Sequence, residues 1–164
     1  MRAALVAVAA LVAAVPAGAA GQPVTGIAGP DPLSGKPVSL DHWRGRPVAI
    51  NVWASWCEGC KEEANALKRF EQAHPNGVLG IDYQDTRAGA RAFYARYDLD
   101  HPSISDPAGK LVGRLKAIGL PTTVFLDKRH VAVYAIAGAA TLDQLNEGWR
   151  RATRGWKPPT ATRR

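Results

Sequence analysis

Cysteine is scarce in this chain: only two of its 164 residues are cysteines, and they lie close together as Cys57 and Cys60. The four histidines are scattered along the sequence: His42, His74, His101 and His130. A structural zinc site commonly takes four ligands, from two cysteine pairs or from one pair with closely spaced histidines. The sequence therefore offers no recognisable zinc site, and metal binding by the single pair stands only as an alternative.

Nucleic-acid-binding motifs and internal repeats are also lacking. The formal net charge is +7, but the basic residues are spread along the chain instead of being massed on one predicted helix. We interpret them as a solvated surface and a basic tail, compatible with weak attraction to acidic lipids or acidic partners. A length of 164 residues with 46% hydrophobic and 21% charged residues is typical of one globular domain.

The one long apolar run lies at the N-terminus. Arg2 precedes an apolar stretch over residues 3–15, Pro16 ends it, and the small residues 17–19 supply a cleavage pattern. We predict that residues 1–20 are a signal peptide, cleaved near their end. An uncleaved anchor is the alternative, although the run is shorter than the roughly 20 residues that span a bilayer. Export places the cysteine pair outside the cytosol, where a donor must keep it reduced.

The cysteine pair lies between a predicted buried strand over residues 47–53 and a predicted helix over residues 58–73. A C-x-x-C at such a junction indicates a thioredoxin-like redox motif. Cys57 is expected at the helix N-cap, where free N–H groups and the helix dipole favour a thiolate. Cys60 follows one turn later, so the two sulfur atoms can close a disulfide.

Other interpretations of the pair remain open. A structural disulfide would stabilise the fold little, because it closes a very short loop. Metal binding and a pair of buried, inert thiols are the remaining alternatives, and the second is disfavoured beside a helix start.

The rest of the chain predicts an α/β domain. The Gly- and Pro-rich residues 20–47 predict a β-hairpin ahead of the core. Further strands are expected over residues 78–83, 104–105, 121–127 and 130–136. Further helices are expected over residues 86–97, 108–116 and 141–151.

Two segments carry a family resemblance: Trp53-Ala54-Ser55-Trp56-Cys57-Glu58-Gly59-Cys60 and Leu120-Pro121-Thr122-Thr123-Val124-Phe125-Leu126-Asp127. Together with Gly80-Ile81-Asp82-Tyr83-Gln84-Asp85, they resemble the TlpA-like branch of the thioredoxin superfamily, which includes the ResA and CcmG types. The resemblance implies a thioredoxin-like fold, with a central mixed sheet flanked by helices and an added N-terminal hairpin. We expect this domain to span residues 21–152, followed by a disordered basic tail over residues 153–164.

The resemblance also implies the site. Cys57 and Cys60 are the expected catalytic residues, and no metal or organic cofactor is implied. Pro121 aligns with the cis-proline of the family, and the backbone of Leu120 is expected to pair with an extended substrate segment. A trans turn proline is the alternative for Pro121.

Three side chains are expected to tune the redox chemistry. Glu58 between the cysteines opposes a thiolate on Cys57 and so favours a reductant over an oxidant; an ordinary helix-start acid is the alternative. Glu63 aligns with an acid in ResA-type proteins and is expected to exchange protons with the thiols or to contact substrate, unless it is a solvated surface residue. Asn51 cannot accept a proton, which leaves Glu63 or a water as the base. Trp56 is expected to shield the disulfide.

The predicted function is therefore that of an exported, monomeric thiol-disulfide oxidoreductase that works as a reductant. By resemblance, the substrate is an apocytochrome c C-x-x-C-H disulfide, and the electron donor is a membrane thiol transporter of the CcdA or DsbD kind. The alternatives are a general extracytoplasmic disulfide reductase or oxidase, and a metal-binding module that uses the C-x-x-C.

Overall fold

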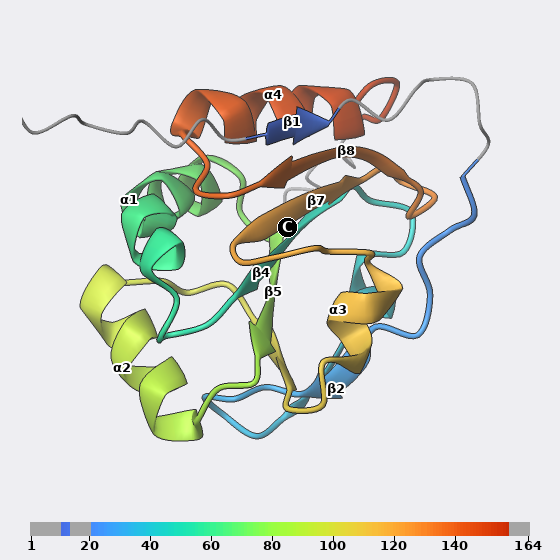
Figure 1. Ribbon diagram of the computed structural model, residues 1–164. Coiled ribbons are helices and arrows are strands. Elements are labelled where there is room, and N and C mark those ends of the chain that lie inside the picture. The colour runs from blue at the N-terminus through green and yellow to red at the C-terminus, as the bar shows by residue number, and fades with distance from the viewer. Residues whose placement is uncertain (1–10, 14–20, 158–164) are drawn as a thin grey trace, which may run out of the picture.

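A mixed six-stranded β-sheet forms the centre of the computed structural model, which describes residues 11–13 and 21–157 (Figure 1). The strand order is β1-β8-β7-β4-β5-β6. These strands are β1 (Leu11–Ala13), β4 (Val48–Trp53), β5 (Val78–Tyr83), β6 (Ser103–Asp106), β7 (Thr122–Leu126) and β8 (Ala132–Ala137). The helices are α1 (Glu58–Ala73), α2 (Arg87–Tyr97), α3 (Lys110–Arg114) and α4 (Leu142–Ala152).

Strand β4 lies in the middle of this sheet. All six of its residues are buried, as expected for a continuous apolar run with covered faces on both sides. It pairs in parallel with β5 and antiparallel with β7. The predicted thioredoxin-like fold with a mixed central sheet is confirmed.

Two hydrophobic layers cover the two faces of the sheet. One layer buries apolar side chains of α1, α2 and α4, and the other buries side chains of α3, the 3₁₀ helix η1 (Leu40–Trp43) and the N-terminal segment. Figure 1 shows α1 and α2 on one side of strands β4 and β5, with α3 on the other. The sheet is thus covered on both faces, and the end of β4 meets the start of α1.

The predicted N-terminal hairpin is confirmed: β2 (Ala28–Pro30) pairs antiparallel with β3 (Pro37–Ser39) as a separate two-stranded sheet. Helix α3 is shorter than the predicted 108–116, because Gly109 and Lys116 adopt left-handed backbone conformations on either side of it. Strand β7 begins at Thr122, one residue after the predicted start.

The N-terminal strand was not predicted. Leu11–Ala13 lies within the apolar run assigned to a signal peptide, and it pairs antiparallel with β8 at one edge of the sheet. The rest of the predicted signal segment, residues 1–10 and 14–20, and residues 158–164 of the predicted basic tail lie outside the described residues. Among the helices that the structure describes, none is both long and apolar enough to cross a bilayer.

A close approach between α4 and β7 yields a test of the packing. A Cβ atom added at Gly148 would collide with the ring of Phe125, whereas one added at Gly113 would meet no atom within 4 Å. We expect Gly148→Ala to lower the free energy of unfolding by about 1–3 kcal/mol, because the core must shift to admit the methyl group.

The matched control is Gly113→Ala, which should raise stability by up to about 1 kcal/mol because alanine is the better helix former. Urea denaturation of both variants measures the difference. Equal effects of the two substitutions would contradict the packing of α4 on β7.

Candidate active site

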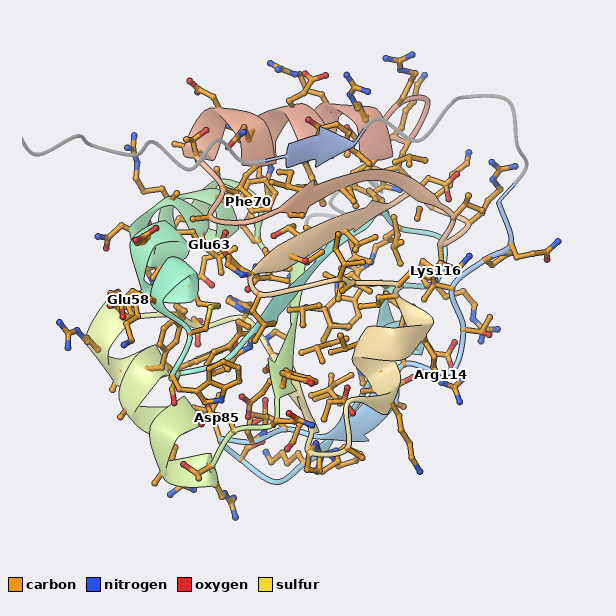
Figure 2. The ribbon with its side chains drawn as sticks, in the orientation of Figure 1. Glu58, Glu63, Phe70, Asp85, Arg114 and Lys116 are labelled. Atoms are coloured by element: carbon orange, nitrogen blue, oxygen red, sulfur yellow. A yellow bond between two sulfur atoms is a disulfide. The ribbon has the colours of Figure 1, made fainter. Side chains whose placement is uncertain are left out.

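The two cysteines begin helix α1. Cys57 is the N-cap residue with extended backbone, and its Sγ accepts a hydrogen bond from the backbone N–H of Cys60 at 3.1 Å. The two residues form a disulfide with their Cα atoms 5.3 Å apart, which Figure 2 draws at the N-terminal end of α1. Cys57 is the more accessible, 6% exposed against 1% for Cys60. The predicted N-cap position is confirmed, and the helix N-terminus favours a thiolate on Cys57.

The segment that contains Pro121 lies against this helix start. The Leu120–Pro121 peptide bond is cis. An ideal Cβ at Gly59, between the cysteines, would lie 3.0 Å from Pro121 Cδ and 4.0 Å from Ala139 Cβ. The absence of a side chain at Gly59 therefore lets the proline pack directly on the C-x-x-C turn, and the position of Pro121 against this turn agrees with the family resemblance.

Glu63 lies inside the protein, not on its surface. It is 3% exposed, so its interpretation as a solvated carboxylate is wrong. Its Oε1 accepts a hydrogen bond from Asn51 Nδ2 at 2.8 Å, and its Oε2 accepts one from the backbone N–H of Ala140 at 2.9 Å. Asn51 Nδ2 also donates to Thr123 Oγ1 at 3.0 Å. This network joins α1 to β4, β7 and the loop before α4.

Burial raises the pKa of Glu63 to about 7, against the lowering effect of the hydrogen bonds from Ala140 and Asn51. Desolvation disfavours the charged carboxylate, so the side chain exchanges its proton near neutral pH. Glu63 follows Cys60 by three residues on α1, which places both on the buried side of the helix. The position suits a group that accepts a proton from a thiol.

Glu58 and Trp56 lie on the outer side of the motif. The Glu58 carboxylate is exposed and pairs with Lys61 Nζ at 3.0 Å, which offsets part of its charge near Cys57. Trp56 is 55% exposed, and its Nε1 donates to the carbonyl oxygen of Gln84 at 3.2 Å. Figure 2 shows Glu58 and Glu63 on the same end of α1, with Asp85 near the end of β5 below it.

Two site residues did not emerge from the sequence. Asp85 accepts hydrogen bonds from Ser55 just before the cysteines. Its position shortly after the predicted strand over residues 78–83 was a usable signal for Asp85. Ala140 contributes a backbone N–H, which no side-chain pattern reveals.

Within the described part of the chain, no three His, Cys, Asp or Glu side chains come together in a way that could hold a metal ion. The arrangement is that of a dithiol–disulfide centre. It has one partly accessible sulfur at a helix N-terminus, one buried sulfur and a buried carboxyl on the next turn. It can accept or donate two electrons by thiol–disulfide exchange.

Comparisons with known proteins agree with this chemistry. Residues 19–147 match the Redoxin family. The thiol-disulfide oxidoreductase ResA of Bacillus thuringiensis subsp. konkukian is 29% identical over 124 residues, which covers 74% of this chain and 72% of that protein.

Two solved structures are similar as well. A DsbF homologue from Corynebacterium diphtheriae superposes with a TM-score of 0.75 at 28% identity, covering 84% of this chain and 90% of that one. A secreted thiol-disulfide isomerase from Corynebacterium glutamicum superposes with a TM-score of 0.68 at 28% identity, covering 79% of this chain and 82% of that one.

The fold and the site together define a thioredoxin-like thiol-disulfide oxidoreductase. The chain belongs to the Redoxin family, and its similarity to ResA agrees with the TlpA-like resemblance of its motifs.

The raised pKa of Glu63 predicts a pH-dependent stability. Its folded pKa of about 7 exceeds the ordinary value of 4.5. The contribution of Glu63 to the free energy of unfolding is therefore fully present below pH 4.5 and is lost as the pH rises through 7. We expect the stability of Glu63→Gln relative to wild type to rise by up to about 3 kcal/mol between pH 4 and pH 8.

Urea denaturation of the oxidised proteins at several pH values measures this difference. The matched control is Glu62→Gln on the exposed side of the same turn, which should change stability by less than about 0.5 kcal/mol. A Glu63→Gln difference that is constant with pH would show that the carboxyl does not titrate in this window.

Proposed function

We propose that the protein is an exported reductant of protein disulfides outside the cytosol. The observation that carries this proposal is Cys57 at the N-cap of α1, with Pro121 packed on the same turn through Gly59. A thiolate-favouring sulfur is thereby placed beside the segment that the family resemblance assigns to substrate backbone. Leu120 would offer that backbone, and the exposed side chain of Trp56, next to Cys57 in the chain, would offer an apolar contact.

The reaction proceeds by two exchanges. The Cys57 thiolate attacks one sulfur of a substrate disulfide, the substrate S–S bond breaks, and the released thiolate takes up a proton. The Cys60 thiol then loses its proton and attacks Cys57 Sγ in the mixed disulfide. The substrate leaves with two thiols, and the protein keeps the two-electron oxidised Cys57–Cys60 disulfide.

The buried acid supports the second exchange. A carboxyl whose pKa is near 7 can take the proton from Cys60 and return it when the disulfide is next reduced. Glu58 adds a negative charge at the helix start, reduced by its ion pair with Lys61. Both acids oppose a thiolate at this site, which favours the disulfide form and hence a reductant.

The substrate and the donor are proposed from the resemblance to the ResA and CcmG types. The substrate is an apocytochrome c C-x-x-C-H disulfide, reduced before haem attachment, and the donor is a membrane thiol transporter of the CcdA or DsbD kind. The segment over residues 1–20 is proposed to direct export. The similarity to a secreted thiol-disulfide isomerase supports this location, and a cysteine pair outside the cytosol requires such a donor.

The assignment of the nucleophile has a direct test. Cys57→Ser should abolish reduction of a peptide disulfide by the reduced protein, because the accessible thiolate is lost. The assay follows thiol release from an oxidised C-x-x-C-H peptide. Full activity of Cys57→Ser would overturn the role of Cys57.

The matched variant Cys60→Ser tests both the mechanism and the substrate. Without the resolving thiol, the mixed disulfide on Cys57 should accumulate, and mass spectrometry of the trapped complex identifies the bound polypeptide. Trapped apocytochrome c supports the proposed substrate. Trapped proteins without a C-x-x-C-H motif would instead support a general disulfide reductase.

A further inference from the structure

A carboxylate at the end of β5 holds the segment that precedes the cysteines. Asp85 Oδ2 accepts the backbone N–H of Ser55 at 2.6 Å, and Asp85 Oδ1 accepts the Ser55 hydroxyl at 2.9 Å. The same Oδ1 also accepts the N–H of Thr86 at 2.7 Å. Hydrogen bonds to a charged acceptor are stronger than neutral ones, so Asp85 fixes Ser55 to the loop between β5 and α2.

This contact is transmitted to Cys57 over two residues. The N–H of Cys57 donates to the carbonyl oxygen of Ala54 at 3.2 Å, so Ser55 and Trp56 are the central residues of a tight turn that ends at the nucleophile. Trp56 Nε1 donates to Gln84 on the same β5–α2 loop. The orientation of Cys57 therefore depends on the attachment of this turn.

A second carboxyl, that of Asp82, lies close to the carboxylate of Asp85. Asp82 on β5 is 1% exposed, and its Oδ1 has no hydrogen-bond partner within the described residues. In the sheet it lies between Trp53 of β4 and Ser105 of β6, neither of which is ionisable. An ionised carboxylate with an unpartnered oxygen in such a place is unfavourable.

The ionisable groups around Asp82 are acidic or phenolic. Burial raises the pKa of Asp82 to about 7, with further contributions from the charge of Asp85 and a hydrogen bond to it. Tyr94 of α2 also faces it and has a pKa raised well above its ordinary value, chiefly by burial. Asp106 ends β6, but its carboxylate accepts N–H groups from the first turn of α3. No basic side chain of the described structure acts on Asp82.

We propose that Asp85 is a positioning residue for Cys57, and that a proton held by Asp82 keeps the Asp85–Ser55 contact in place. The proton on Asp82 bridges to Asp85, which remains a carboxylate and continues to accept from Ser55. This inference rests on the proposed attacking role of Cys57 and is independent of the direction of electron flow.

The sign of the pH effect follows from the raised pKa of Asp82. Below about pH 7 Asp82 is protonated and the pair carries one charge. Above that pH two adjacent carboxylates repel each other in a poorly solvated place. Asp85 then moves away from Asp82, its contact with Ser55 weakens, and the turn before Cys57 becomes less ordered.

The first test follows the Ser55 amide by NMR in the oxidised protein between pH 5.5 and 9. In wild type, its chemical shift should change with a midpoint near pH 7, when Asp82 titrates. Asp82→Asn should abolish this change, because an amide can donate to Asp85 at every pH. Glu63→Gln should leave it intact, since Glu63 bonds to other partners. A Ser55 shift that is constant in wild type, or that titrates equally in Asp82→Asn, would overturn the proposal.

The second test measures exchange of the reduced protein with glutathione disulfide, corrected for the thiolate fraction of Cys57. Asp85→Asn should slow this reaction by about tenfold at pH 6.5, because misplaced reacting groups react more slowly. Gly89→Ala is a second variant that leaves every charge in place: an added Cβ would lie 2.7 Å from Asp85 Oδ1 and closer still to Ser55 Oγ. It should slow the exchange as well.

The corrected rate of exchange with glutathione disulfide should fall above pH 7 in the wild-type protein and should not fall in Asp82→Asn. Unchanged exchange in both Asp85→Asn and Gly89→Ala would show that the contact does not position Cys57. Because glutathione disulfide replaces any protein substrate, failure of the proposed protein-reductase activity would not affect either result.

Discussion

The hydrogen bond from the Cys60 N–H to Cys57 Sγ is the contact on which the site depends. It makes a cysteine the cap of α1, so the reactive sulfur occupies the position where unpaired N–H groups and the helix dipole stabilise a negative charge. That position exists because β4 delivers the chain, fully buried, to the start of the helix. The glycine between the cysteines then leaves room for Pro121.

Buried acids surround this helix start on two sides. Glu63 lies one turn after the second cysteine and bonds to the loop before α4, while Asp85, just after β5, bonds to Ser55 in the turn before the first cysteine and has the buried Asp82 near it. Burial raises the pKa of both Glu63 and Asp82 to about 7. Perturbed carboxyls of this kind concentrate at functional sites. Glu63 is the carboxyl that we propose to exchange protons with the thiols, and Asp82 is the carboxyl that we propose to hold Asp85 in place.

Much of the fold could be predicted from the sequence because its signals are local. The bounds of α1 and β5 agree with prediction, since continuous apolar runs and helical periodicity are strong patterns. Thr86 and Thr141, the first residues of two predicted helix ranges, are the N-caps of α2 and α4, and their side chains accept hydrogen bonds from the first turn. The three-residue strand β1 could not be predicted, because its pairing depends on the distant strand β8.

The candidate site could be predicted in part. The spacing of the cysteines and the Leu120–Pro121 pair identified the centre, and the helical spacing from Cys60 made an inward Glu63 possible without deciding it. The contact between Asp85 and Ser55 joins residues 30 apart in the sequence, and the acceptor role of Glu63 toward Ala140 uses a backbone donor. Such contacts arise from tertiary packing, which a single sequence does not encode in any short pattern.

The reduction potential of the Cys57–Cys60 disulfide, measured by equilibration with dithiothreitol, tests the central claim most directly. A centre flanked by Glu58 and the buried Glu63 should favour the disulfide, and we expect a potential near or below about −230 mV, on the reducing side of the glutaredoxin range. A potential near about −120 mV, that of a strong disulfide oxidant such as DsbA, would contradict the account of the protein as a reductant.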